Sequence, residues 1–445
     1  MDASKLNWLS ATDAARAIRE GTIGSEQLTE ACLARVREAE PQVQAWTFLD
    51  PEHALSQARA RDAEHREGKP AGPLHGVPIG IKDIIDTGDM PTEDGTVLHA
   101  GRTPAHDATV VGMLRAAGAV IMGKTVTTEC AYFHPGKTRN PHNAEHTPGG
   151  SSSGSAAAVA AGMVPLALGS QTNGSVIRPA AFCGVYGFKP THGLLPRGGI
   201  MKLSRTLDHV GLFARTLDDI ALLAEQLVGH DMRDPDTRPR ARVPFIAVVA
   251  EEPPLPPLLA FVKGPVWERA GEETKEAFAE LVATLGDRVV EVDLPHSALQ
   301  ALDWHRTIME AEAAANLDLE WEKGRDRISE PLRGLLARGR EVKALDYQLA
   351  CARISLINEG FEEIFERCDA VVTPAAPGTA PRGLDSTGDP AFCTLWTLCG
   401  MPALNLPLMR GVNDLPMGVQ LVGRRDGDAR LLRTARWLAA RIEPR

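Results

Sequence analysis

The stretch Gly149–Gly162, GGSSSGSAAAVAAG, places four serines within five positions, between a pair of glycines and a run of alanines. A serine hydroxyl is a weak nucleophile unless a neighbouring base takes its proton. Histidine is the most frequent base, yet His192 is the only histidine in the forty residues that follow this stretch. The sequence therefore raises the question of which hydroxyl reacts, and with which base.

A nucleotide-binding pattern also occurs, but its context argues against it. Residues Gly118–Thr125, GAVIMGKT, satisfy the phosphate-loop pattern GxxxxGK[ST]. That loop is a glycine-rich turn between a strand and a helix, whereas here four apolar residues separate the glycines and follow a predicted helix. The segment therefore reads as a strand whose amides pair within a sheet, and we expect no nucleotide site.

The segment Gly150–Gly154, GSSSG, fits the GxSxG nucleophile elbow of α/β-hydrolases. That elbow requires an apolar strand before it, and the preceding TRNPHNAEHTPG is polar. It also requires a later acid followed by a histidine, and the last histidine is His305, 140 residues before the end. The elbow interpretation is therefore disfavoured.

Taken together, the motifs of residues 149–193 resemble those of the amidase signature family. GGSSSG is followed 24 residues later by a second serine in QTNGS, and then by PAAFCG and GFKPT. GVPIGIKD lies upstream, and AVVTPAAP, GMPALNLPL and PMGVQLVG lie downstream in the same order. The resemblance covers nearly the whole chain from about Leu74.

The resemblance implies a Ser-Ser-Lys triad with Ser175 as nucleophile, Ser151 as proton relay on a cis peptide bond, and Lys82 as base. Burial disfavours the charged form of a lysine and lowers its pKa, and the apolar GVPIGIK would bury Lys82. Ser175 would attack the carbonyl and form an acyl-enzyme that water hydrolyses. Backbone amides would stabilise the oxyanion: Thr172, Asn173, Gly174 and Ser175.

The other polar residues of these motifs have simpler interpretations. Ser152, Ser153 and Ser155 are expected to cap or line the start of the alanine-rich helix. His192 lies in a KPTHG turn, and Cys183 is expected to be a small buried residue.

The nucleophile loop, which we define as residues 171–178, departs from the family pattern D-T-G-G-S-[IV]-R. Gln171 replaces the acid, Asn173 replaces a glycine, and Arg178 stands one place later than usual. Asn tolerates the backbone angles of glycine better than most residues. We expect neutral hydrogen bonds from Gln171 to hold the loop, with Arg178 pointing elsewhere.

The resemblance implies a hydrolase that cleaves C–N bonds of small amides or carbamates, as amidases, aryl acylamidases and urethanases of the family do. Tyr132, Phe133 and His134 are expected near the acyl pocket, with helices around Trp304–Trp321 as the other wall. Such a lining favours hydrophobic or aryl groups over charged ones. Two alternatives stay open: the ammonia-releasing A subunit of a tRNA-dependent amidotransferase, and a catalytically silent binding protein.

The surrounding elements predict an α/β fold, and the resemblance implies a central twisted mixed sheet surrounded by helices. Helices are expected after Ser10 and Ser25, in TVVGMLRAAGA, and over most of 341–368. Strands are expected in AVIMG, FIAVVA, DAVVTP and GVQLVG. The Pro-rich segments around 233–257 suggest a loosely packed connecting segment within the fold. We expect one domain over 1–445: a helical part (1–70), a catalytic core (74–215), and the remaining sheet and pocket helices (216–445).

Composition narrows the partners of the chain. A net charge of -10 without a basic block makes nucleic acid an unlikely partner. Seven scattered cysteines without a metal-ligand spacing suggest reduced thiols in the cytoplasm, and no metal or cofactor is expected. Neither a signal peptide nor a membrane span is expected. The expected partner is a small amide or carbamate, and a homodimer is an open alternative.

Overall fold

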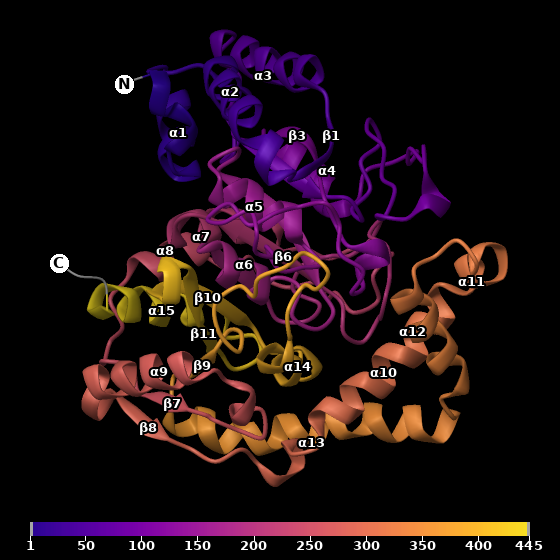
Figure 1. The fold of residues 1–445 in the computed structure, drawn as a ribbon. Coiled ribbons are helices and arrows are strands. Elements are labelled where there is room, and N and C mark those ends of the chain that lie inside the picture. The colour runs from indigo at the N-terminus through magenta and orange to yellow at the C-terminus, as the bar shows by residue number, and fades with distance from the viewer. Residues whose placement is uncertain (1–2, 443–445) are drawn as a thin grey trace.

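One continuous sheet organises the molecule (Figure 1), and the computed structural model describes residues 3–442. The sheet has eleven strands in the order β1-β3-β2-β4-β6-β5-β10-β11-β9-β7-β8. The strands are β1 (Trp46–Leu49), β2 (Pro78–Lys82), β3 (Val120–Thr125), β4 (Leu166–Gln171), β5 (Tyr186–Lys189), β6 (His209–Ala214), β7 (Leu259–Phe261), β8 (Val289–Glu291), β9 (Ala370–Pro374), β10 (Ala403–Arg410) and β11 (Pro416–Val422).

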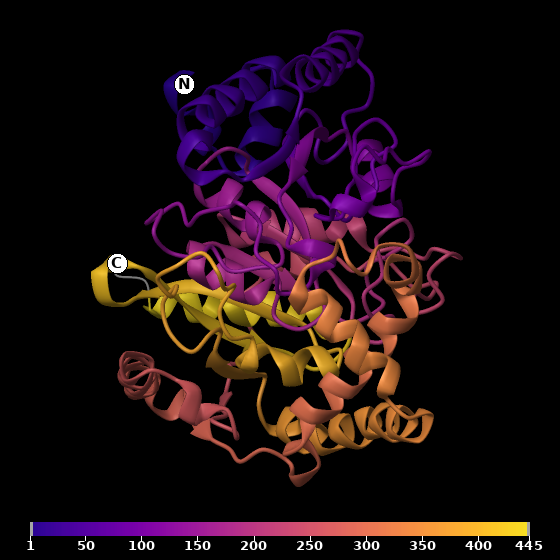
Figure 2. The same cartoon turned by 45° about the vertical axis from the view of Figure 1, so that its right-hand side comes forward.

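Helices surround this sheet on both faces and at both ends (Figure 2). They are α1 (Ala11–Arg19), α2 (Ser25–Val43), α3 (Pro51–Arg66), α4 (Thr109–Ala116), α5 (Ser153–Ala160), α6 (Ile177–Cys183), α7 (Leu217–Leu227), α8 (Phe245–Ala250), α9 (Glu272–Leu285), α10 (Ala301–Asn316), α11 (Asp318–Gly324), α12 (Glu330–Glu341), α13 (Ala344–Arg367), α14 (Ala391–Leu398) and α15 (Asp428–Ile442). The predicted α/β class with a helix-covered mixed sheet is confirmed. No helix among the described residues is long and apolar enough to cross a bilayer.

The strands that carry the site lie in the N-terminal half of the sheet. Strand β2 pairs in parallel with both β3 and β4, and all residues of these three strands are buried. A strand covered on both faces is apolar throughout, as PIGI and LAL are here. Since parallel strands end at the same edge of a sheet, Lys82 at the end of β2 and Gln171 at the end of β4 come together there.

The order of the strands interleaves distant parts of the chain. Strand β5 pairs on one side with β6 and on the other with β10, which follows it by more than 200 residues. Helix α14 precedes β10, and α10 packs against α12, α13 and α14. The last third of the chain is therefore built directly onto the strands of residues 74–215.

Most of the predicted elements are present. The helices predicted after Ser10, after Ser25, in TVVGMLRAAGA and in 341–368 are α1, α2, α4 and α13, and GAVIMGKT contains strand β3 instead of a phosphate loop. One prediction was wrong: FIAVVA forms helix α8, not a strand. It packs against α7 and α15 outside the sheet, with Phe245 and Val249 buried.

Candidate active site

Lys82 lies at the centre of the site. It is fully buried, and its Nζ donates hydrogen bonds to Ser151 Oγ at 2.6 Å and to Ser170 Oγ at 2.8 Å. Burial lowers the pKa of Lys82 to about 7, and the charge of Asp208 opposes this shift. A substantial fraction of this amine is therefore neutral at neutral pH, as a base must be.

The two serines of the expected triad share one small cavity. The peptide bond between Gly150 and Ser151 is cis, and the adjoining loop brings Ser151 to Lys82. Ser175 follows β4 and precedes α6, and it is 8% exposed. The cavity is lined by Ala131, Tyr132, Phe133, Ser151, Thr172, Asn173, Gly174, Ser175, Arg178, Leu203 and Met309.

The loop from Thr172 to Ser175 contributes both a hydroxyl and free backbone donors to this cavity. In the part of the chain that the structure describes, the amides of Asn173, Gly174 and Ser175 have no hydrogen-bond acceptor. Such amides beside a nucleophile can stabilise the negative oxygen of a tetrahedral intermediate. The loop therefore offers donors to an oxyanion, and the assignment of Thr172, Asn173, Gly174 and Ser175 as the oxyanion hole stays a prediction.

Gln171 holds this loop, as its sequence position suggested. Its Oε1 accepts hydrogen bonds from the amides of Val176 at 2.7 Å and Ile177 at 3.0 Å. Its Nε2 donates to Thr397 Oγ1, which donates in turn to the carbonyl of Asn173. Helix α14 and the start of α6 are thus linked to the nucleophile loop by neutral hydrogen bonds.

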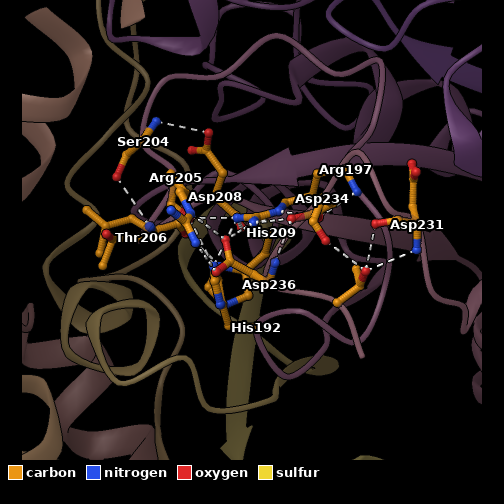
Figure 3. A network of polar contacts seen from close by, with 12 residues as sticks. His192, Arg197, Ser204, Arg205, Thr206, Asp208, His209, Asp231, Asp234 and Asp236 are labelled. Atoms are coloured by element: carbon orange, nitrogen blue, oxygen red, sulfur yellow. Dashed lines mark hydrogen bonds and ion pairs between the residues drawn. The ribbon is translucent and has the colours of Figure 1, made fainter. Parts of the chain in front are cut away.

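Three residues that the sequence motifs did not single out support the site. Ser170 is the second acceptor of Lys82, while His305 of α10 contacts the carbonyl of Thr172 at 2.8 Å. Asp208, labelled in Figure 3, accepts a 2.6 Å hydrogen bond from the hydroxyl of Thr172. Burial raises the pKa of Asp208 to about 6 and lowers that of His305 to about 4.

Arg178 lies in the wall of the cavity with an incomplete set of partners. It is 2% exposed, and its Nη2 donates to the carbonyl of Gly150 and to Thr387 Oγ1. Its Nε and Nη1 have no partner within the described residues. Burial lowers its pKa to about 10, so the guanidinium is still charged at neutral pH. Within residues 3–442 it forms no hydrogen bond with Gln171 and no ion pair with a carboxylate, and its guanidinium carbon lies 5.9 Å from the centre of the Phe133 ring.

The remaining predicted pocket residues divide into two groups. Tyr132 and Phe133 line the cavity, and Met309 of α10 supplies the opposite wall, within the expected 304–321 region. His134 is exposed and does not line the cavity. His192 does not line the cavity; it lies beside Arg197 in the network of Figure 3, which also contains Asp208, and burial lowers its pKa to about 4.

The extra serines of the glycine-rich stretch connect elements to one another. Ser152 Oγ donates to the carbonyl of Ser170, Ser153 Oγ to that of Val126, and Ser155 Oγ to that of Leu168. No side-chain hydrogen bond caps α5, so of the two expected roles these serines have only the second, that of lining the start of the helix. These hydroxyls instead fix α5 to strand β4 and to the end of β3.

Comparison with known proteins agrees with this geometry. The model of the Amidase family matches residues 27–432. The chain belongs to the amidase family. Its relatives include the A subunit of glutamyl-tRNA(Gln) amidotransferase from Chloroflexus aggregans, which is 37% identical over 475 residues, covering 97% of this chain and 96% of the relative. This amidase is therefore an enzyme of the C–N hydrolase type.

Solved structures show the same fold. Native peptide amidase from Stenotrophomonas maltophilia superposes with a TM-score of 0.85 at 30% identity, covering 98% of this amidase and 97% of that chain. The 6-aminohexanoate cyclic dimer hydrolase superposes with a TM-score of 0.88 at 27% identity, covering 98% of both chains. These similarities establish the fold and the reaction type. The substrates named for these proteins are theirs and are not assigned to this chain.

Proposed function

We propose that this amidase hydrolyses small amides whose acyl part carries a carboxylate, through an acyl-enzyme on Ser175. The observation that carries the proposal is the guanidinium of Arg178, which is buried in the cavity wall with two nitrogens that have no partner among the described residues. A buried charge without an ion-pair partner is costly, even beside the Phe133 ring, and a carboxylate is the natural planar partner of a guanidinium. This replaces the expectation that the pocket favours uncharged groups.

The proposed reaction uses Lys82, Ser151 and Ser175 in the roles that the family resemblance implies, and the hydrogen bond from Lys82 to Ser151 supports it. Neutral Lys82 takes the proton of Ser151, Ser151 takes that of Ser175, and Ser175 Oγ bonds to the amide carbon. The negative oxygen meets the free amides of the nucleophile loop. The C–N bond then breaks, Ser151 returns a proton to the leaving nitrogen, and Lys82 replaces it. Water attacks the ester through the same relay and releases the acid.

Covalent labelling tests the nucleophile. A fluorophosphonate should modify Ser175, located by mass spectrometry, and Lys82→Ala should slow the labelling by orders of magnitude because the base is lost. An adduct on another serine, or an unchanged rate in Lys82→Ala, would show that the mechanism is incorrect.

Paired substrates test the role of Arg178. Succinamate and butanamide differ by a carboxylate in place of a methyl group. Arg178→Met should weaken the binding of the succinamate transition state by about 2–5 kcal/mol, because a buried charge pair is broken. The change is measured as a fall in kcat/KM. Butanamide hydrolysis should be little affected. Equal losses for both amides would assign Arg178 a structural role only.

A second candidate is the ammonia-releasing A subunit of a tRNA-dependent amidotransferase. The relative from Chloroflexus aggregans, which carries the name of such a subunit, covers 97% of the chain at 37% identity, and it supports this candidate better than the expected aryl amides or carbamates. Glutamine is a primary amide with a carboxylate and so suits Arg178 as well. Glutamine hydrolysis that depends on a stoichiometric protein partner would establish this candidate.

A further inference from the structure

Helix α13 carries a row of apolar side chains on its outer face. In Figure 1 this helix lies along the lower edge of the molecule, outside α10. Leu345, Leu349 and Leu356 are 67%, 49% and 45% exposed, and Ala352 between them is exposed as well. We name these four residues the leucine stripe. Single exposed apolar residues are normal on a protein surface, whereas a group of them on one element marks a contact surface.

The spacing of the leucine stripe is that of a helix that pairs with another helix. Its four members follow one another at intervals of four, three and four residues. Because a helix turns once in 3.6 residues, such positions form one narrow line along its axis. The core-facing side of α13 is separate from this line and buries Ala350, Ile357, Phe361 and Ile364. The stripe is therefore a second apolar face, which residues 3–442 leave exposed.

The charges beside the leucine stripe indicate what covers it. Asp346 and Arg353 lie seven positions apart and hence on one flank of the stripe. Neither forms an ion pair within the described residues, and the guanidinium carbon of Arg353 lies 5.8 Å from the centre of the Trp304 ring. The other flank carries the uncharged Gln348 and Ser355. One flank thus has an unpaired acid and an unpaired base, and the other flank has neither.

A second, antiparallel copy of α13 complements this arrangement. A two-fold axis midway between Leu349 and Ala352 places Leu349 opposite the second copy's Ala352, and the two outer leucines opposite each other. Reversing one helix brings the same flank of both copies to one side, so Asp346 lies beside the second copy's Arg353. Each contact of a two-fold dimer occurs twice, which gives two ion pairs. In a parallel pair both charges would instead face the uncharged flank.

We propose that this amidase forms a homodimer in which the leucine stripes of two copies pack against each other in antiparallel orientation. The stripe covers about three turns of one helix, so the dimer is weak, with a dissociation constant on the order of 10 μM. The proposal is independent of the substrate and of the nucleophile, because the described residues that line the catalytic cavity include none of α13.

Sedimentation equilibrium of the full chain tests the leucine stripe. Leu349→Arg should raise the dissociation constant by about 100-fold, because it places an unpaired charge in the middle of an apolar contact. Leu319→Arg is the matched control, since Leu319 is 63% exposed on α11 and lies outside the stripe, and it should change nothing. Both variants should keep the circular dichroism of the wild type, because both side chains are exposed. A wild-type chain that is monomeric at about 100 μM, or equal dissociation constants for the two variants, would overturn the proposal.

Exchanging the flanking charges tests the orientation of the two helices. Asp346→Arg and Arg353→Asp each place like charges opposite one another twice per dimer, so each should raise the dissociation constant by roughly 10-fold. The double variant Asp346→Arg/Arg353→Asp restores both opposite pairs in the antiparallel dimer only, and its dissociation constant should return to within about 3-fold of the wild type. Losses that add up in the double variant, or single variants without effect, would overturn the antiparallel arrangement.

Discussion

Lys82 owes its basicity to its surroundings, and one neighbouring charge opposes the main effect. Burial lowers its pKa to about 7, and the carboxylate of Asp208 acts in the opposite direction. Since only the neutral amine accepts a proton, kcat/KM should rise with pH through a midpoint near 7 and then level off. The pH profile therefore reports directly on the environment of this side chain.

Asp208→Asn should move this midpoint to lower pH. The variant removes the charge that favours protonated Lys82, so the neutral base persists further into the acidic range. A kcat/KM profile for succinamate measures the shift. Thr172→Val should move the midpoint in the same direction but less far, because loss of its hydrogen bond raises the pKa of Asp208 and leaves that carboxyl less charged near pH 7. A midpoint that stays in place in Asp208→Asn would contradict the electrostatic role.

Local sequence motifs predict the candidate residues of the site, but they do not predict the partners of those residues. Lys82, Ser151 and Ser175 stand in local motifs, and the structure brings Lys82 to Ser151 and both serines to one cavity. Asp208 and His305 contact the nucleophile loop from 36 and 133 positions away. No local spacing can reveal such contacts, because the order of strands and the packing of α10 create them.

At the scale of elements, α5 approaches the sheet so closely that one glycine has no room for a side chain. A Cβ on Gly154 would lie 2.2 Å from the carbonyl oxygen of Ala45 and 2.4 Å from the amide of Val126. A Cβ on Gly112, within α4, would meet nothing within 4 Å. The two glycines therefore form a matched pair for the same substitution.

Gly154→Ala should reduce the free energy of unfolding by about 1–3 kcal/mol, because overpacking against backbone cannot relax. Gly112→Ala should increase it by about 0.5–1 kcal/mol, because alanine favours the helix. Urea unfolding followed by circular dichroism measures both. Similar stabilities for the two variants would be inconsistent with the described packing of α5.

Helix α8 is a segment whose sequence pattern does not decide between helix and strand. FIAVVA is a short apolar run rich in β-branched residues, and such a run fits either a buried strand or one buried turn of helix. Its packing on α7 and α15, rather than a local preference, determines its structure. The other three predicted strands, AVIMG, DAVVTP and GVQLVG, are β3, β9 and β11 in the structure.

At the scale of the whole molecule, the two halves of the chain share one sheet across the 251–257 connection. This segment is largely exposed, with Leu255 78% exposed, whereas β10 of the second half pairs with β5 of the first. Cleavage at a protease site inserted after Glu252 should therefore leave the fragments associated. Size-exclusion chromatography should show one particle of unchanged size that is still labelled at Ser175. Separation of the fragments without denaturant would refute the shared sheet.

The interleaved sheet also sets the moment at which a newly synthesised chain can become active. All three residues of the proposed triad have been synthesised by position 175, but Thr397, which supports the nucleophile loop, and strand β10, which flanks β5, come from the last third of the chain. A nascent chain stalled before residue 391 carries the complete set of reacting groups without their support. Hydrolytic activity should thus be a property of finished molecules, and we expect translation products truncated before residue 391 to be inactive although they contain every reacting side chain.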